Sequence, residues 1–407
     1  MTAGSRGDVA PFTGLGHGLA RAGHEVTLVT HERFGPLAAR AGLGFHALPV
    51  DPRAELESSR GRALHRSSTG VGKLVRVVAM ARALAGEMAD DLVAAARTSD
   101  ALLLSGSVAP LGHAIAEGLA LPSLGLNLQP LGATREFPPP MLGIGSWGGL
   151  GNRVAGVGLN LAVEQVFASA VPAVRTRLGL PSKRPAAALR ARERQGWPVL
   201  HGFSPRVVAR PRDWRSGLDV AGYWWPYDGD DRLPDDLLRF IDSGPPPVFV
   251  GLGSATVPDP TRTSTEIVRA LRRAGLRGVI QRGWAGLTAT GDDMLTIGEV
   301  PHAALFPRMA AVVHHAGAGT TAAGLRAGVP AVPVPIQFDE TFWAARLVSL
   351  GVAPRAVPLR HLTADALGTA LTRATRDAEY QERAQVLGGE IREEDGVTPV
   401  VQAVNGL

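Results

Sequence analysis

A glycine-rich turn with two histidines is the part of the sequence whose residue types point most directly to chemistry. His314-His315-Ala316-Gly317-Ala318-Gly319 leads from an apolar run into a helix expected to begin at Thr320 or Thr321. Unpaired N–H groups and the dipole at a helix start bind phosphate oxygens, and glycines let the backbone approach them. His315 can donate a hydrogen bond there and stabilise negative charge. The alternative is a packing turn, since it is neither a Walker A sequence nor a dinucleotide fingerprint.

A second polar loop, Gly4-Ser5-Arg6-Gly7-Asp8, stands before a helix expected over 9–22. Asp8 suits the N-cap of that helix. Only three residues precede the loop, where a βα unit requires a strand. Our hypothesis is that the true start lies upstream, and mass spectrometry showing Met1 as the native N-terminus would refute it.

Short apolar runs alternate with helical stretches along the whole chain, which predicts a parallel α/β architecture. We expect two doubly wound domains facing each other across a cleft, with a stiff connector over 206–221 and a long irregular loop over 137–152. Functional loops should follow the carboxyl ends of the strands. Strands are expected at 25–30, 101–105, 247–252, 278–281, 294–297, 311–314 and 331–334, and helices at 9–22, 112–119, 264–274, 302–309 and 321–327.

Composition excludes several classes of function. The 407 residues exceed one ordinary core, and cysteine is absent, which excludes disulfides, thiolate metal sites and a cysteine nucleophile. The net charge of +5 is spread along the chain, so we expect no nucleic-acid partner. We also expect a cytoplasmic protein with no integral membrane segment, because no run reaches roughly 18 apolar residues and no secretory signal is visible. No histidine and carboxylate cluster has metal-ligand spacing.

Residues 300–354 resemble the donor-binding signature of GT-B glycosyltransferases of family 1. The resemblance is to the branch that holds sterol glucosyltransferases and bacterial antibiotic glycosyltransferases, and it covers most of the chain in order. It rests on Pro301-His302, His314-His315, Gly319-Thr320-Thr321, Phe342-Trp343 and Arg346-Leu347, on Gly4 to Val9 with Pro11-Phe12, on Ser204-Pro205, Pro211, Asp213-Trp214 and Gly222-Tyr223-Trp224, and on Pro245 to Gly251, Gly253-Ser254 and Gly283-Trp284.

The resemblance implies a GT-B fold of two Rossmann-like domains. Residues 1–212 would bind the acceptor and 213–394 the nucleotide sugar, while a C-terminal helix over 395–407 would pack back on the first domain. The implied enzyme is an inverting hexosyltransferase that moves a sugar from a UDP- or dTDP-sugar to a hydroxyl of a small lipophilic natural product or sterol-like acceptor. Asp8 then becomes the general base, in competition with the N-cap role.

The same resemblance implies the rest of the site. The donor diphosphate would be held by Ser5, Gly253, Ser254, His315, Gly317, Ala318, Gly319 and Thr320, with His315 also catalytic. Trp284, unless it is only core packing, and Val300 would meet the base and ribose. Asp339 and Glu340 would bind the sugar, although Glu340 stands where relatives have glutamine and could be a surface residue. An alanine at 323, where users of UDP carry glutamate, leaves UDP or dTDP open.

Helix dipoles would replace a divalent cation at the diphosphate, so the expected cofactor is none beyond the nucleotide-sugar co-substrate. Phe137, Met141 and Trp147 are the candidates for the acceptor pocket. Alternatives are a lipid-linked glycosyltransferase or a nucleotide-sugar epimerase on this fold, and a catalytically inactive auxiliary or partner-binding relative. Retention of Asp8, His315 and Asp339 together argues against an inactive site. Oligomeric state, acceptor and sugar stay open.

Overall fold

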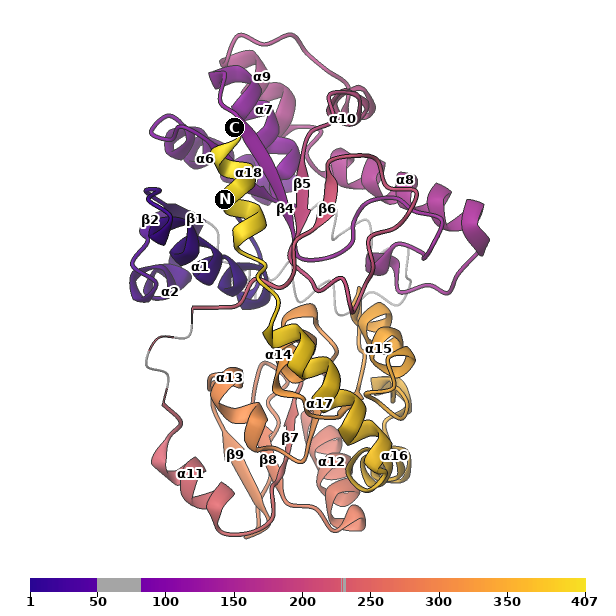
Figure 1. Ribbon diagram of the computed structural model, residues 1–407. Helices are drawn as coiled ribbons and strands as arrows, with labels where there is room; N and C mark the ends of the chain where they lie inside the picture. Colours follow the sequence, from indigo (N-terminus) through magenta and orange to yellow (C-terminus); the bar gives the residue numbers. More distant parts are fainter. Residues whose placement is uncertain (50–81, 228, 230–231) are drawn as a thin grey trace.

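Two α/β units make up the computed structural model, which describes residues 1–49, 82–227, 229 and 232–407 (Figure 1). The N-terminal unit holds a two-stranded parallel sheet and a four-stranded one of order β3-β4-β5-β6, also parallel. Their strands are β1 (Thr27–His31), β2 (Gly44–Leu48), β3 (Leu102–Ser105), β4 (Ser123–Asn127), β5 (Val199–His201) and β6 (Leu218–Val220).

Residues 1–3 lie between these two sheets. The N–H of Thr2 donates to the carbonyl of Val29 in β1 at 3.0 Å, and the N–H of Ser105 in β3 donates to the carbonyl of Met1 at 3.0 Å. The N-terminal amine of Met1 also donates to the carbonyl of Leu103 at 2.8 Å. This short extended segment therefore connects β1 to β3 and leads directly into the loop before Asp8.

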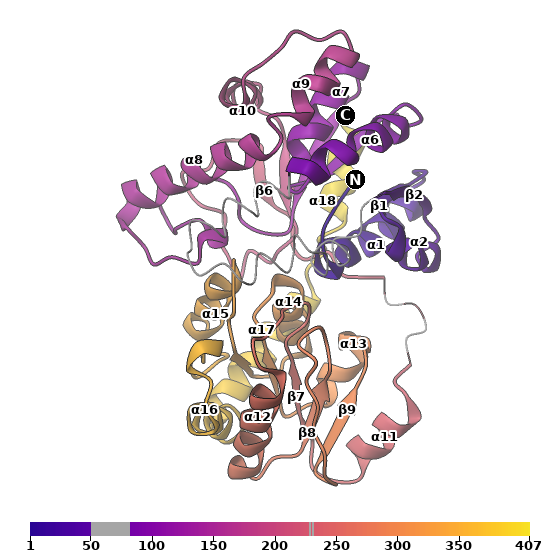
Figure 2. The same ribbon diagram turned by 180° about the vertical axis from the view of Figure 1, so that it is seen from behind.

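Helices cover both faces of the N-terminal sheets (Figures 1 and 2). They are α1 (Arg6–Arg21), η1 (Glu32–Phe34), α2 (Gly35–Arg40), α6 (Ala89–Ala96), α7 (Ala109–Leu119), η2 (Pro140–Leu142), α8 (Gly148–Val166), α9 (Ala170–Arg177) and α10 (Pro185–Arg194). Apolar side chains of α6, α7 and α9 form one buried core with β3. A second core joins α1, α2 and β1.

The C-terminal unit is a five-stranded parallel sheet of order β11-β10-β7-β8-β9. Its strands are β7 (Val248–Gly251), β8 (Gly278–Gln281), β9 (Met294–Ile297), β10 (Ala311–His314) and β11 (Ala331–Pro333). Its helices are α11 (Asp235–Asp242), α12 (Pro260–Ala274), α13 (His302–Leu305), η3 (Phe306–Arg308), α14 (Ala318–Ala327), α15 (Glu340–Ser349), η4 (Leu359–His361), α16 (Ala364–Arg376) and α17 (Ala378–Arg392). The order reverses between β7 and β10. Doubly wound sheets bind ligands outside the carboxyl ends of strands at such a point.

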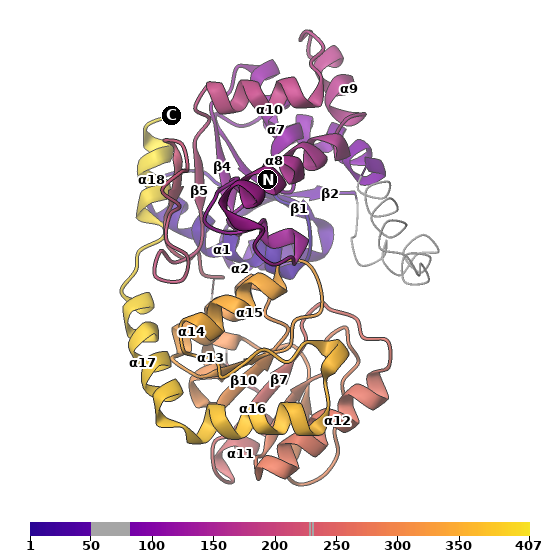
Figure 3. The same ribbon diagram turned by 90° about the vertical axis from the view of Figure 1, so that its right-hand side faces the viewer.

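The chain returns to the N-terminal unit at its end, where α18 (Thr398–Asn405) packs against α1 (Figure 3). Val400 is fully buried in the core that contains Leu15 and Trp224. Trp224 donates from its indole nitrogen to the carbonyl of Gly396 at 2.9 Å. The two units are thus joined by two crossing segments. The expected domain boundary at residue 212 falls before β6, which pairs with β5 in the N-terminal sheet.

Several expectations about local structure are wrong. Helices α7 and α12 begin three and four residues before their expected starts at 112 and 264. The segment 137–152 is not wholly irregular, since it contains η2 and the first turn of α8. The helices of the two polar loops also begin earlier than expected, at Arg6 and at Ala318. In α8 and in these two helices, glycines inside the helix hid its start, because glycine costs about 1 kcal/mol there and reads as a turn signal. No single helix in the described part of the chain is long and apolar enough to cross a membrane.

Candidate active site

The turn after β10 is shaped by a left-handed residue that is not glycine. Ala316 has φ 65°, and its N–H donates to Nδ1 of His314 at 3.1 Å. An alanine in this region is strained and persists where its surroundings hold it. Gly317 follows as the N-cap, so the N–H groups of Ala318, Gly319 and Thr320 are the ones at the start of α14. The hydroxyl of the next residue, Thr321, is buried.

His315 is wedged between two backbones at this turn. A Cβ on Gly253 would lie 2.6 Å from Cε1 of His315, and a Cβ on Gly317 would lie 2.4 Å from Nε2. Gly253 follows β7 and Gly317 caps α14, so the imidazole connects the two strand ends at which the sheet order reverses. Burial lowers the pKa of His315 to about 4. The ring is therefore neutral at pH 7 and donates from one nitrogen only.

Trp284, which was expected at the nucleotide base, lies beside Gly253 and therefore close to the imidazole of His315. Trp284 donates its backbone N–H to the carbonyl of Gly253 at 3.1 Å. Its ring is half-buried and lies 6.0 Å from the guanidinium of Arg33, which belongs to the N-terminal unit. Trp284 is thus not a fully enclosed core residue. Ser254 is exposed and Val300 half-buried, at the ends of β7 and β9 respectively.

Asp8 occupies the third position of α1 rather than the N-cap. Ser5 is the N-cap, and it donates from its backbone N–H and its hydroxyl to Oδ2 of Asp8 at 2.8 and 3.0 Å. Burial raises the pKa of Asp8, and the two bonds from Ser5 oppose that rise. Among the described residues, Oδ1 has no hydrogen-bond partner. A carboxylate fixed through one oxygen and accessible through the other can accept a proton.

Two residues around Asp8 have roles that the sequence did not indicate. A Cβ on Gly4 (φ 144°) would lie 2.4 Å from Oδ2 of Asp8, so only glycine fits there. Its N–H donates to Nε2 of His31 at the end of β1, at 2.9 Å. The hydroxyl of Ser5 is committed to Asp8, and in this arrangement it has no hydrogen to give a diphosphate.

The two polar loops face each other because α1 packs against α14 across the two units. An ion pair joins the start of α1 to the segment that follows β9, with Nη1 of Arg6 lying 3.3 Å from Oε2 of Glu299. Arg6 belongs to the loop named in the sequence, whereas Glu299 was not singled out there. Both are more than half exposed, so the pair contributes little to stability.

Asp339 belongs to the same site, whereas Glu340 performs a different task. Asp339 is the N-cap of α15, and its Oδ2 accepts the indole N–H of Trp343 at 2.9 Å. Burial raises the pKa of Asp339, and the charge of Asp8 adds to that rise, so the two carboxylates share one region. Glu340 is only 6% exposed, and its Oε2 accepts the N–H groups of Ile336 and Gln337 at 2.5 and 2.7 Å. It is therefore not a surface residue.

The acceptor candidates are not all brought together. Phe137 packs against Phe342 of α15 with ring centroids 5.3 Å apart, so it lies at the interface of the two units next to Asp339. Met141 is half-buried in η2. Trp147 precedes α8 and is 67% exposed, so it lines no enclosed pocket among the described residues. Of the three, Phe137 has the clearest connection to the site.

Comparison with known proteins identifies the family of the chain. Residues 1–138 match the glycosyltransferase family 28 N-terminal domain, and 279–407 match the erythromycin biosynthesis protein CIII-like C-terminal domain. An O-mycaminosyltylonolide 6-deoxyallosyltransferase of Streptomyces fradiae is 36% identical over 98% of this chain and 94% of its own. A sterol 3-beta-glucosyltransferase of Candida albicans is 31% identical over 99% of this chain, which spans only 27% of that protein.

Among solved structures, the glycosyltransferase SsfS6 of Streptomyces sp. SF2575, complexed with thymidine diphosphate, is similar with a TM-score of 0.63 at 21% identity. The alignment covers 100% of this chain and 98% of that one. The expected GT-B fold, with two Rossmann-like domains, is confirmed. The chain belongs to the glycosyltransferase family that includes the sterol glucosyltransferases and the antibiotic glycosyltransferases.

Proposed function

We propose that this protein transfers a sugar, with inversion, from a UDP- or dTDP-sugar to a hydroxyl of a small lipophilic acceptor. The observation that carries the proposal is the pairing of two loops: His315 wedged at the start of α14, and Asp8 fixed through one oxygen at the start of α1. One loop suits a leaving diphosphate and the other suits an acceptor hydroxyl.

In the proposed reaction, Asp8 takes the proton of the acceptor hydroxyl while its oxygen attacks the anomeric carbon from the face opposite the nucleotide. The bond from that carbon to the diphosphate oxygen breaks, and its electron pair stays on the diphosphate. The N–H groups of Ala318, Gly319 and Thr320 and the imidazole N–H of His315 stabilise the negative charge that develops. Asp339 accepts a hydrogen bond from a sugar hydroxyl.

The donor and acceptor classes are supported by the relatives. The solved relative holds thymidine diphosphate, and one curated relative is named for a deoxy sugar on a macrolide, the other for a sterol. Both acceptor types are lipophilic. Ala323 leaves the choice between ribose and deoxyribose open, and both donors are therefore included in the proposal.

Oε2 of Glu340 holds the loop before α15, whereas Oε1 has no hydrogen-bond partner among the described residues. We therefore propose Asp339 as the main sugar contact, with Glu340 beside it. An unmodified hexose is included among the donors to be tested.

The test is a matrix of UDP- and dTDP-sugars against macrolide aglycones and sterols, with products read by mass spectrometry and anomeric configuration by NMR. We expect transfer with inversion from at least one donor. Nucleotide-sugar binding without transfer or hydrolysis would favour an inactive auxiliary relative, and absence of binding would contradict the proposal altogether.

We also propose that the reaction is independent of metal, because the helix start of α14 and His315 supply the positive field at the diphosphate. Chelation of divalent cations by EDTA should leave the initial rate unchanged within about twofold. A loss of activity that Mg²⁺ restores would show that a cation completes the diphosphate site.

A further inference from the structure

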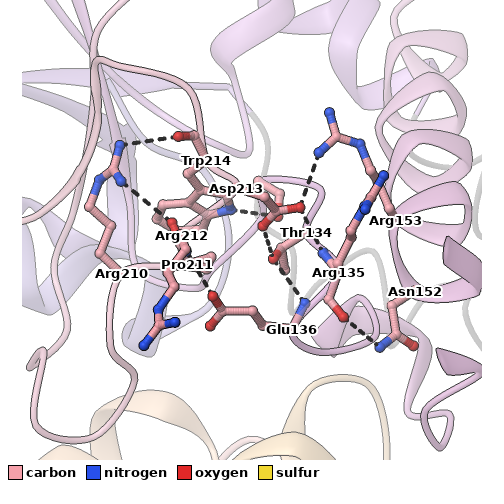
Figure 4. Close-up of polar contacts among 11 residues, drawn as sticks. Thr134, Arg135, Glu136, Asn152, Arg153, Arg210, Pro211, Arg212, Asp213 and Trp214 are labelled. Atoms are coloured by element: carbon pink, nitrogen blue, oxygen red, sulfur yellow. Dashed lines mark hydrogen bonds and ion pairs between the residues drawn. The ribbon is translucent and has the colours of Figure 1, made fainter. Parts of the chain in front are cut away.

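A carboxylate outside the reacting groups holds the acceptor-side loop in place. The segment from Gly132 to Phe137 follows β4 and runs between α8 and the connector that leads to β6 (Figure 4). Asp213, in that connector, accepts the hydroxyl of Thr134 at 2.5 Å and the backbone N–H of Arg135 at 2.9 Å. Its second oxygen also meets the guanidinium of Arg153, on α8, at 3.0 Å. One side chain therefore ties together three separate segments.

The charge state of Asp213 is consistent with this role. Burial alone would raise the pKa of Asp213, but the hydrogen bonds that its carboxylate accepts outweigh burial and keep the pKa below its ordinary value. Thr134 is only 2% exposed; its hydroxyl donates to this carboxylate, and its oxygen accepts the backbone N–H of Glu136 at 3.1 Å. Charged acceptors form the stronger hydrogen bonds in proteins.

Neighbouring contacts hold the same segment from both sides. A Cβ on Gly132 would lie 2.8 Å from the indole of Trp214, which donates to the carbonyl of Gly132 at 3.1 Å. A Cβ on Gly156 of α8 would lie 2.9 Å from Ala133. Asn152, 2% exposed, donates to the carbonyl of Arg135 at 3.2 Å. Contacts with the connector and with α8 thus hold the residues just before Phe137 in place.

Phe137 links this loop to α15, which belongs to the C-terminal unit. Its ring contacts Phe342, whose neighbour Trp343 donates to the carboxylate of Asp339. Phe137, the acceptor candidate, is therefore connected to the residue proposed to bind the sugar through two aromatic contacts. A displaced loop would place the ring of Phe137 differently against α15 and so change how an acceptor is held.

We propose that Asp213 is a positioning residue for the acceptor: it fixes the 132–137 loop so that Phe137 forms the acceptor wall facing the donor sugar. This inference rests on the proposed function for its acceptor, but the loop that it describes can be measured separately. Asp213 touches no reacting group, and its effect reaches the reaction only through Phe137.

The experiment compares Asp213→Asn with the control Asp293→Asn. Asp293 also pairs with an arginine, Arg272, at 2.8 Å, but on the far side of the C-terminal unit. Hydrogen exchange of 131–147, donor dissociation constants and the acceptor kcat/KM are measured for both. We expect Asp213→Asn to speed exchange in that segment and to lower the acceptor kcat/KM roughly tenfold or more, mainly through KM, with donor binding unchanged. The control should change none of these.

Unchanged exchange in 131–147 would overturn the proposal, as would faster exchange with an unaltered acceptor KM. If Asp213→Asn does not fold, Arg153→Gln removes one of the three contacts from an exposed partner and should give a smaller change of the same kind. Thr134→Val should give no further loss in combination with Asp213→Asn. Failure of the proposed function is distinct, because the wild-type protein would then transfer no sugar while the exchange result still holds.

Discussion

At the scale of single residues, the carboxylates of the site differ in role because their neighbours differ. Asp8 and Glu340 are both shielded from water, and burial raises the pKa of each. In each of them one oxygen accepts two hydrogen bonds, Oδ2 of Asp8 from Ser5 and Oε2 of Glu340 from the backbone N–H groups of Ile336 and Gln337. The bonds to Asp8 come from the N-cap of its own helix, whereas those to Glu340 hold the loop before α15.

Glu340 makes stability depend on pH. Its pKa is raised to about 7 by burial, against hydrogen bonds from the backbone that lower it. The folded state therefore binds this proton more tightly than the unfolded state, and the resulting stability is present below about pH 4.5 and is lost as pH rises to 7. We predict that Glu340→Gln is more stable than wild type at pH 8, by up to about 3 kcal/mol, and equal to it near pH 4.

Urea denaturation at both pH values measures this difference. Glutamine can still accept the two backbone N–H groups through its oxygen, so only the charge is removed. A variant less stable than wild type at pH 8 would show that the ionised carboxylate is favourable in the folded protein.

At the scale of elements, the start of α14 depends on a close approach between backbone and imidazole. Gly317 has φ −64°, which alanine adopts readily, so its glycine is needed only for space beside His315. We predict that Gly317→Ala displaces the imidazole and weakens binding of UDP or dTDP about tenfold or more, with a larger loss in kcat. Calorimetric titration and steady-state kinetics measure the two effects.

Gly324→Ala, in the same helix, is the matched control. Its added Cβ would meet no atom within 4 Å, so it should stabilise α14 by about 0.5–1 kcal/mol and leave nucleotide binding unchanged. Equal losses of nucleotide binding in both variants would mean that binding does not depend on the position of the His315 imidazole.

Elements built from continuous apolar runs were predictable, and those that begin or run through glycines were not. The expected strands at 278–281, 294–297 and 311–314 agree with β8, β9 and β10, because strands of a covered parallel sheet are short, nearly continuous apolar runs. Helix α8 escaped prediction because its glycines pack against partners far away in sequence, as Gly156 does on Ala133. The tasks of Ser5 and Glu340 were equally hidden, since both depend on hydrogen bonds that only the folded loop reveals.

At the scale of the whole molecule, the two units are held together where the chain crosses back. A Cβ on Gly396 would lie 2.4 Å from the carbonyl oxygen of Tyr223, so the two crossing segments touch backbone to backbone. We predict that Gly396→Ala destabilises the protein by about 1–3 kcal/mol, because backbone atoms must move apart. Gly389→Ala, whose Cβ has only the end of Arg392 at 3.9 Å, should have no such cost. Urea unfolding compares them, and equal stabilities would contradict this view of the crossing.

We propose that Asp8 and the start of α14 act on one donor and acceptor from opposite sides of the interface between the two units. The most direct test is the Asp8→Asn variant, assayed with the donor and acceptor that wild type accepts. We predict that kcat falls by about 10²- to 10⁴-fold while the dissociation constant of the nucleotide diphosphate is unchanged, since Asp8 meets the acceptor and not the nucleotide. A variant that keeps kcat within about threefold of wild type would contradict the assignment of Asp8 as the base.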